Sequence, residues 1–548
     1  MKSLLADWRL YWFVLLLPVA LFLPAVPIDE TRYLAVAWEM RASGDFLLPH
    51  LNGDIYTHKG PLLFWLINFG WLVAGIHVWV VRLGVLAASL VSLVLFERLA
   101  LRLDADAAFA RRATLVLAGM TLFALFSSLI MFDMLLTTCV LIVMHGIVDL
   151  DAQRLRRGVA LVAVGAALGL LVKGPVVLLD ACIPALLAPW WSETARRGVM
   201  RWYSTLLLGV VGGVVLALTW ALLAGGLPFI QTILLHQTAE RISQSFAHAR
   251  PFWWYFMVLP LLILPWMVSL RAPWHVWRVS LIATRAARFG LLSFLPALIA
   301  FCFFSGKQPH YLLPLLPGLA LYIAEVLNNA DACVRGRLFG LLLIVAGLAL
   351  AAMPYLAEHA ATLPLLDKLA HNGSFSPTEQ HVMGGVWPLW GGLLLLLGAV
   401  LLAHPRAHAR LHVLALSSAA AISVGLLAIA QAAGPTLDVS ATAARIRAAQ
   451  EAGKPIAHLG WHHGLFEFPG RLTQPLEKVD LDTLYPWCAA HPDGEVVTFY
   501  TKYGIPVKPE LEIPYRLGRI LIWRAADLCA GPRPAPLAKP DEDETPDD

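Results

Sequence analysis

Long apolar runs separated by short polar stretches make up the first 430 positions of the chain. Runs of about 20 uncharged residues, such as 203–225 and 386–403, match the roughly 30 Å of hydrocarbon that a spanning helix must cross. We therefore expect about 13 membrane-spanning helices. The expected spans are 9–27, 78–97, 113–130, 132–149, 158–173, 174–191, 203–224, 251–270, 286–304, 310–327, 337–355, 386–404 and 410–431.

The pattern changes near Gly434. Residues 441–452 have the periodicity of an amphipathic helix, and 496–500 and 519–523 read as short strands bounded by Gly and Pro turns. These features predict a small α/β domain over 434–531. The last stretch, 532–548, is Pro-rich and then acidic, and it is expected to be a disordered tail because it has nothing with which to build a core.

Composition places the chain in a membrane. It is 59% apolar and 14% charged, whereas soluble domains are about 25% charged. The prediction is an all-α polytopic membrane domain over 1–433, followed by the α/β domain. The formal net charge is only +4, and the basic residues gather between apolar runs, so no nucleic-acid partner is implied.

The arginine clusters predict the orientation of the chain, because Lys and Arg accumulate in cytoplasmic loops. They fall in every second loop. This pattern predicts a cytoplasmic N-terminus, with the outer loops 28–77, 225–250 and 356–385 and the C-terminal domain in the periplasm of a bacterial inner membrane. The clusters are Arg98/Arg102/Arg111/Arg112, Arg154/Arg156/Arg157, Arg196/Arg197/Arg201, Arg271/Arg278/Arg285/Arg288, Arg335/Arg337 and Arg406/Arg410.

Two of the six cysteines, Cys488 and Cys529, fall in the predicted outer domain. Disulfides persist in an oxidising compartment such as the periplasm. A bridge between these two cysteines is therefore compatible with the predicted location, and spacing alone leaves it open.

Adjacent carboxylates, Asp29 and Glu30, stand directly after the first apolar run. Arg32 follows them in a segment expected to form an interfacial helix as far as Ala42. Carboxylates at a membrane boundary are costly unless they are solvated or used. The structural alternative is an ordinary helix start, where acidic residues favour the positive end of the helix dipole.

The next segment carries a resemblance to a known family. A Gly-Asp turn at 44–45 is followed by Tyr56-Thr57-His58-Lys59-Gly60-Pro61-Leu62-Leu63-Phe64-Trp65. Together with the acidic pair, this order resembles the GT-C glycosyltransferases related to protein O-mannosyltransferases. It is most similar to the aminoarabinose transferases of lipid A.

Later segments extend this resemblance over much of the membrane part. They include Asp133 at the start of a span, the turn Val172-Lys173-Gly174, the segment from His236 to Arg241, and the turn 305–314 with its Lys-x-Pro-x-Tyr pattern. The family implies a GT-C fold and inverting transfer of a sugar from a polyprenyl phosphate, with no covalent enzyme intermediate.

The required chemistry suggests roles for individual residues. A base must deprotonate a protonated acceptor, for which we choose Asp29, and cations or hydroxyls must stabilise the leaving phosphate. For any single cation the structural alternative is a side chain that snorkels to lipid headgroups. The expected substrate-binding residues are Lys59, Arg241 and Tyr311 for the phosphate, with Lys307 and Arg32 in reserve, Glu30 and Asp133 for the sugar, and Tyr56.

His58 and His236 could bind Zn²⁺ if the fold brings them together, although no cofactor is required by the chemistry. The resembling transferases usually carry Glu where His58 stands, and Lys59-Gly60-Pro61 replaces their more typical Lys-Pro. These departures concern the identity of the substrate more than the fold.

The predicted function is transfer of 4-amino-4-deoxy-L-arabinose from undecaprenyl phosphate to lipid A by a monomeric enzyme, with resistance to polymyxin and other cationic peptides as the consequence. One alternative is a transferase of another polyprenyl-linked sugar, such as a hexose or uronic acid, to lipopolysaccharide or protein. A transporter or flippase would carry mid-span charges or two similar halves, and a non-catalytic scaffold would leave the polar outer loops unexplained.

Overall fold

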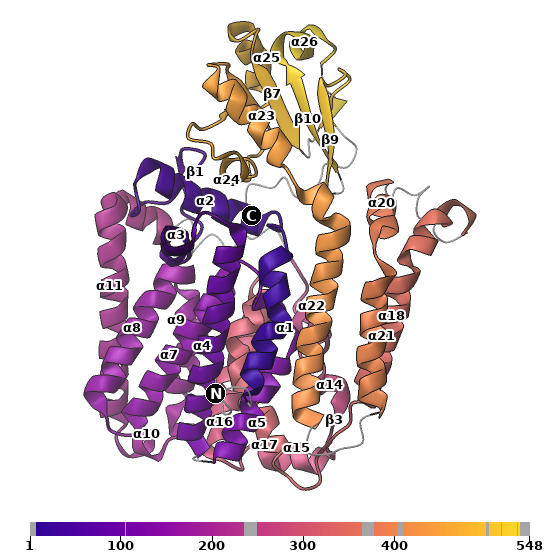
Figure 1. The fold of residues 1–548 in the computed structure, drawn as a ribbon. Helices are drawn as coiled ribbons and strands as arrows, with labels where there is room; N and C mark the ends of the chain where they lie inside the picture. Colours follow the sequence, from indigo (N-terminus) through magenta and orange to yellow (C-terminus); the bar gives the residue numbers. More distant parts are fainter. Residues whose placement is uncertain are drawn as a thin grey trace. The chain divides into compact units, whose positions relative to one another are not determined.

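The computed structural model describes residues 7–104, 106–234, 249–363, 377–403, 410–499, 503–516, 518–533 and 535–536. The chain forms two compact units. Unit 1 comprises Met1–Phe22, Thr57–Leu348 and Gly391–Leu427, and unit 2 comprises Leu23–Tyr56, Ala349–Trp390 and Ala428–Asp548. Figure 1 shows their helices and strands with the labels used below.

Unit 1 is built almost entirely from helices. Its elements are α1 (Trp8–Phe22), α3 (Leu62–Ala74), α4 (Val78–Asp104), α5 (Ala107–Gly119), α6 (Thr121–Phe126), α7 (Phe132–Asp151), α8 (Leu155–Lys173), α9 (Val176–Leu186), η1 (Ala188–Trp190), α10 (Glu193–Arg197), α11 (Val199–Leu234), α13 (Trp254–Leu262), α14 (Trp266–Ser269), β3 (Leu270–Arg271), α15 (Trp274–Ser280), α16 (Arg285–Phe303), η3 (Pro309–Leu315), α17 (Leu316–Val326) and β4 (Cys333–Val334). Helices α18 (Arg337–Glu358), α21 (Pro388–Ala403) and α22 (Arg410–Leu437) contribute residues to both units.

The chain is a multi-pass membrane protein with fewer full-length spans than the 13 expected. Seven helices of the described residues are long and apolar enough to cross a membrane, or eight if α20 (Pro377–Gly385) and α21 are one bent span. Helices α1, α3 and α9 are apolar but shorter. The expected count was too high for uninterrupted helices, because hydropathy does not register where a helix breaks.

Two breaks explain part of the difference. The expected span 113–130 is divided at Met120, whose backbone is extended, into α5 and α6. The expected span 251–270 is divided near Pro265 into α13 and α14. Proline lacks the N–H that continues a helix, so an apolar run that contains it can be long without forming one helix.

Helices α7 and α8 form the antiparallel pair that organises unit 1. They are joined by the short turn 152–154, so the first residues of α7 lie at the same end as the last residues of α8. The apolar stretch of α7 is 78% buried, as expected for a helix that is apolar on all sides. Side chains at the two ends of this pair are thus held by well-packed helices.

Unit 2 contains the helix α2 (Asp29–Ser43), the expected interfacial segment, and the C-terminal α/β domain. Its other elements are β1 (His50–Leu51), β2 (Asp54–Ile55), η4 (Ala360–Thr362), α20, α23 (Ser440–Glu451), β5 (Ile456–Leu459), α24 (Glu467–Gly470), β6 (Glu477–Val479), α25 (Leu481–Ala490), β7 (Glu495–Phe499), β8 (Tyr503–Gly504), β9 (Leu511–Tyr515), β10 (Gly518–Arg524), α26 (Ala525–Ala530) and β11 (Ala535–Pro536). The strands and the amphipathic helix expected at 496–500, 519–523 and 441–452 are confirmed as β7, β10 and α23.

The main sheet has the strand order β6-β5-β7-β10-β9. Strand β5 pairs in parallel with β6 and β7, whereas β10 pairs antiparallel with β7 and β9. Alternate residues of β7 enter different cores: Val497 and Phe499 pack with α23, and Val496 packs with α25 and α26. This follows from the two-residue period of a strand and gives a three-layer α/β/α arrangement.

Cys488 and Cys529 form a disulfide that links α25 to α26. Their spacing in the sequence had not decided whether this bond forms. Strand β11 lies inside the stretch expected to be disordered and pairs antiparallel with β8, Ala535 with Gly504 and Pro536 with Tyr503. Residues 537–548 of that stretch lie outside the described residues.

Candidate functional site

A buried cluster of charged side chains in unit 1 surrounds Asp133. The Nζ atom of Lys173 lies 2.7 Å from Asp133 Oδ1, and the Nε2 atom of His310 lies 4.0 Å from Asp133 Oδ2. The Asp133 side chain is 2% exposed and that of Lys173 is 12% exposed. An ion pair so well shielded from water has a much stronger field than one at the surface.

The helix ends explain how the two charges meet. Asp133 stands in the first turn of α7, after the extended residue Met131, where a carboxylate complements the helix dipole. Lys173 is the last residue of α8, before Gly174 with φ +71°. The N-terminus of α7, which favours an acidic residue, therefore lies beside the C-terminus of α8, which favours a basic one.

Tyr311 and Lys59 complete the charged cluster. The Lys173 ammonium lies 4.5 Å from the centroid of the Tyr311 ring, within the range of a cation–π contact. Lys59 interacts electrostatically with Asp133. Gly60 permits this approach, because a Cβ there would lie 2.1 Å from the carbonyl oxygen of Leu171 in α8. We call Lys59, Asp133, Lys173, His310 and Tyr311 the Asp133 cluster.

Asp180 in α9 is a further buried carboxylate near this cluster. It is 1% exposed, and neither of its oxygens accepts a hydrogen bond within the described part of the chain. It interacts electrostatically with Lys173 and Asp133. Lys173 is thus the ammonium that two buried carboxylates share.

Lys307, expected as a reserve residue for the phosphate, contacts two backbone carbonyl groups. Its ammonium donates to the carbonyl oxygen of Arg250 at 2.9 Å and to that of Phe304. Burial lowers the pKa of Lys307 below its usual range. The side chain closes the end of α16 through backbone contacts, and these are the interactions that the structure assigns to it.

Unit 2 carries the other predicted residues on α2. The Tyr33 hydroxyl donates to Asp29 Oδ1 at 2.9 Å, and the backbone N–H of Val26 donates to Glu30 Oε2 at 2.7 Å. Burial, and then the charge of Asp29, raises the pKa of Tyr33 well above its usual range. Tyr33 therefore keeps its proton and holds Asp29 in one orientation.

Arg32 is buried at the point where α2 meets the C-terminal domain of the same unit. The loop residue Gly464 has φ +75°, and a Cβ there would lie 2.9 Å from the Cβ of Ala35 and 3.4 Å from the Cα of Arg32. Only glycine adopts this conformation at so close an approach without strain. Tyr56 is also buried, and its backbone N–H donates to Pro49.

A second buried polar group lies beside α2 in unit 2. The Nε2 atom of His462 lies 2.7 Å from Glu467 Oε1, and both side chains are almost completely buried. Burial lowers the pKa of the adjacent His458 well below its usual range, and the neighbouring His462 adds to this effect. Glu39 accepts a hydrogen bond from the backbone N–H of Gly53 at 3.0 Å.

Glu39 provides a prediction for the pH dependence of stability. Burial, and to a smaller degree the charge of Glu467, raises the pKa of Glu39 from 4.5 to about 7. Between these values the folded chain holds a proton that the unfolded chain has released. The free energy of unfolding should therefore fall, by on the order of 2 kcal/mol, as the pH rises from about 4.5 to about 7.

Glu39→Gln should remove this dependence and raise the melting temperature at pH 8, because the amide resembles the protonated acid. Melting of the purified protein between pH 5 and pH 8 measures the effect, with the exposed Asp493→Asn as the matched control. The prediction is contradicted if the melting temperatures of Glu39→Gln and the wild type change with pH by the same amount.

Only one of the two histidines expected to bind zinc, His58, lies in the part of the chain that the structure describes. His236 and Arg241 lie outside the described residues. His58 lies in the loop before α3, and the described ranges contain no group of three His, Cys, Asp or Glu side chains placed to hold a metal ion. A zinc site that uses His58 and His236 stays a prediction.

Sequence reasoning missed three members of the buried site, Lys173, His310 and Asp180. Lys173 was noted as part of a turn, His310 as part of a motif, and Asp180 was not noted. The available signal was the same in each case, a charged or polar residue inside or at the end of an apolar run, which is costly in a membrane and marks a function by default.

Chemically, the Asp133 cluster can stabilise an anion that develops charge. A fixed ammonium, a hydroxyl and two further basic side chains surround a site of low dielectric, where preorganised charges are most effective. The Asp29–Tyr33 pair offers an oriented carboxylate that can accept a proton.

No protein-family model matches the chain. The undecaprenyl phosphate-alpha-4-amino-4-deoxy-L-arabinose arabinosyl transferase of Pseudomonas aeruginosa is 30% identical over 370 residues, 64% of this chain and 65% of that protein. The protein of the same name from Edwardsiella ictaluri is 28% identical over 399 residues, 67% of each. The chain thus spans about 65% of the length of the Pseudomonas relative.

Solved structures share the fold. The crystal structure of ArnT from Cupriavidus metallidurans bound to undecaprenyl phosphate matches with a TM-score of 0.72 and 20% identity, over 96% of this chain and 98% of that one. The apo structure of the same protein matches with a TM-score of 0.71. The resemblance drawn from the sequence is confirmed: the chain is similar in sequence to undecaprenyl phosphate aminoarabinose transferases, over about 65% of the Pseudomonas relative, and it shares the fold of ArnT.

Proposed function

We propose that the chain is an inverting glycosyltransferase that moves 4-amino-4-deoxy-L-arabinose from undecaprenyl phosphate to a phosphate of lipid A. The names of the Pseudomonas and Edwardsiella relatives support this sugar and this donor. The matching Cupriavidus structure holds undecaprenyl phosphate, which supports a lipid-linked donor for this chain.

The observation that carries the proposal is the buried ammonium of Lys173, fixed between Asp133 and the Tyr311 ring. A donor that leaves as a phosphate monoester gains negative charge as its glycosidic bond breaks. Lys173 and Lys59 would stabilise that charge, and Tyr311 would position it. Asp133 would hold Lys173 in place or accept the amine of the sugar.

The proposed reaction is a direct displacement. An oxygen of the acceptor phosphate forms a bond to the anomeric carbon, the bond from that carbon to the donor phosphate breaks, and its electron pair leaves with undecaprenyl phosphate. Where the acceptor oxygen carries a proton, Asp29 removes it. Arg32, Tyr56, Glu30 and Arg241 are proposed to bind substrate, with the Glu30 carboxylate suited to an amine.

We propose a location in a bacterial inner membrane, with the N-terminus in the cytoplasm. Four arginines of unit 1 meet around the α7–α8 turn, and the Asp133 cluster lies at the opposite end of these helices. By the positive-inside rule the arginine end would be cytoplasmic and the Asp133 end periplasmic. A cationic sugar on lipid A would weaken the attraction of polymyxin to the membrane.

The test is an assay of the purified protein with undecaprenyl-phosphate-linked aminoarabinose and lipid A, read by mass spectrometry of lipid A. We expect a pentosamine increment that requires both donor and protein. A parallel reaction with an undecaprenyl-phosphate hexose should give no increment.

The other outcomes discriminate between functions. An increment only with the hexose donor would replace aminoarabinose while keeping the reaction type. No increment with any lipid-linked sugar, together with movement of the donor across a vesicle membrane, would support a flippase instead.

A further inference from the structure

Arginine side chains converge at the end of unit 1 that lies away from the Asp133 cluster. Asp133 and Asp151 stand at opposite ends of α7, about 27 Å apart at the rise of an α-helix. At the Asp151 end, the α7–α8 turn meets α10, the start of α11, the end of α4 and the start of α16. Two cavities flank the turn.

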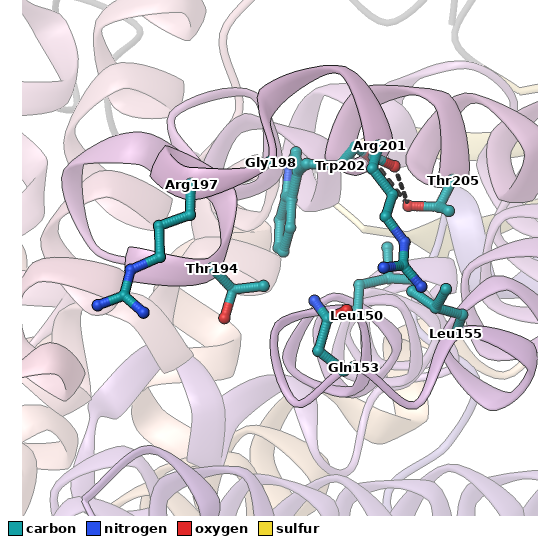
Figure 2. A pocket seen from close by; sticks show the side chains of 9 residues that line it. All are labelled: Leu150, Gln153, Leu155, Thr194, Arg197, Gly198, Arg201, Trp202 and Thr205. Carbon is teal, nitrogen blue, oxygen red and sulfur yellow. Dashed lines mark hydrogen bonds between the residues drawn. The ribbon is translucent and has the colours of Figure 1, made fainter.

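The first cavity has a volume of about 270 Å³ and lies between the α7–α8 turn, α10 and α11. Arg201 extends from α11 toward the turn, Gln153 enters the same space from the turn, and Thr194 and Arg197 lie along α10 (Figure 2). Gln153 has φ +58°, a conformation that costs energy for a residue with a side chain. Such strain at a cavity is a reason to look for a function.

The second cavity has a volume of about 560 Å³ and lies on the other side of the turn. Its lining includes four arginines and one aspartate, Arg102, Arg154, Arg157, Arg285 and Asp151.

Two carboxylates balance part of this charge. Arg102, Arg154 and Arg157 all approach the fully buried Asp149, and Arg285 pairs with Asp151. These four arginines against Asp149 and Asp151 leave two positive charges in excess. Arg154 and Arg157 are 62% and 64% exposed, so their guanidinium groups remain accessible to a ligand.

We propose that these two cavities bind the headgroup phosphates of anionic phospholipids. Guanidinium groups bind phosphate through two parallel hydrogen bonds, and basic pockets between helices are typical binding sites for anionic headgroups. The walls fit an amphiphile as well, because Leu150, Leu155 and Trp202 line the first cavity beside Arg201 and Gln153.

A role of these arginines in orienting the protein in the membrane does not explain the two cavities or the conformation of Gln153. The positive-inside rule requires only that basic residues lie in the loop. It requires neither a cavity on each side of the turn nor a strained glutamine aimed into one of them. The proposal is also independent of the sugar-transfer reaction, since its readout is lipid binding.

The test measures melting of the delipidated protein in neutral detergent with added phosphatidylglycerol, phosphatidylcholine or inorganic phosphate, and counts bound lipids by native mass spectrometry. Phosphatidylglycerol should stabilise the wild type saturably. The variant Arg154→Gln/Arg157→Gln/Arg201→Gln should bind it at least about tenfold more weakly. Arg156→Gln is the matched control, because Arg156 lies in the first turn of α8, between Arg154 and Arg157 in the chain, but lines neither cavity.

A second variant, Arg154→Lys/Arg157→Lys/Arg201→Lys, keeps the charge that orients the protein but removes the guanidinium fork. It should still bind more weakly than the wild type, and it decides the matter if the glutamine variant does not fold. Equal stabilisation by phosphatidylcholine, equal weakening in Arg156→Gln, or full affinity in the lysine variant would overturn the proposal. Equal protection by inorganic phosphate would assign the cavities to a free anion.

Discussion

Lys173→Met should lower the rate of sugar transfer by about 10²–10³ and destabilise the protein by about 3–5 kcal/mol. The variant removes the ammonium 2.7 Å from Asp133 and leaves that carboxylate buried without its main partner. The loss of rate and the loss of stability have different causes, since the first concerns the leaving phosphate and the second concerns an uncompensated charge.

The double variant Asp133→Asn/Lys173→Met separates these causes. A buried ion pair replaced by neutral groups is often as stable as the original, so the melting temperature should recover. The rate should stay low, because no ammonium is restored. Rates are to be measured at saturating donor, with Arg278→Gln, an exposed arginine on α15, as the control. If both the melting temperature and the transfer rate recover, the ion pair between Asp133 and Lys173 has only a structural role.

The elements of the fold that repeat a simple pattern were predictable. Helix α7 and strands β7 and β10 follow their apolar periods, and the sequence placed them within one to two residues. The divided spans were not predictable from hydropathy, because the breaks at Met120 and near Pro265 do not make either segment polar.

One local signal was overlooked. Asn52 and Gly53 both have positive φ, 53° and 82°, and they connect β1 to β2. An Asn-Gly pair is the strongest short-range indication of a hairpin. The side chain of Asn52 then bonds both backbone groups of Leu476, at 2.9 Å and 2.7 Å, a pairing across 424 residues that no local pattern contains.

Some residues of the candidate site could likewise be predicted from the sequence, whereas others could not. Asp133, Lys59 and Tyr311 could be proposed from motifs that a known family shares, and the structure brings them together in unit 1. The contact of His462 with Glu467, and its effect on Glu39 in a helix more than 400 positions earlier, depend on tertiary packing. Such buried groups are visible only when the fold is known.

Asp29→Asn should lower the turnover number by about 10²–10⁴ if the acceptor phosphate must lose a proton, with little change in the affinity for the donor. The amide keeps the shape of the side chain, and its oxygen can still accept the hydrogen bond that the Tyr33 hydroxyl donates to Asp29 at 2.9 Å. Stability should fall by no more than about 1 kcal/mol, the usual contribution of one carboxylate at the start of a helix.

Glu39→Gln is the matched control for Asp29→Asn, because it makes the same carboxylate-to-amide change in the same helix and should alter the pH dependence of melting rather than the turnover number. Tyr33→Phe, which removes only the orienting hydroxyl, should lower the turnover number less than Asp29→Asn does. Initial rates of pentosamine transfer to lipid A, measured under single-turnover conditions, separate the chemical step from product release. Equal rates for Asp29→Asn and the wild type would mean that the acceptor reacts as an ionised phosphate oxygen and needs no base, and the charge of the Asp133 cluster alone would then carry the reaction.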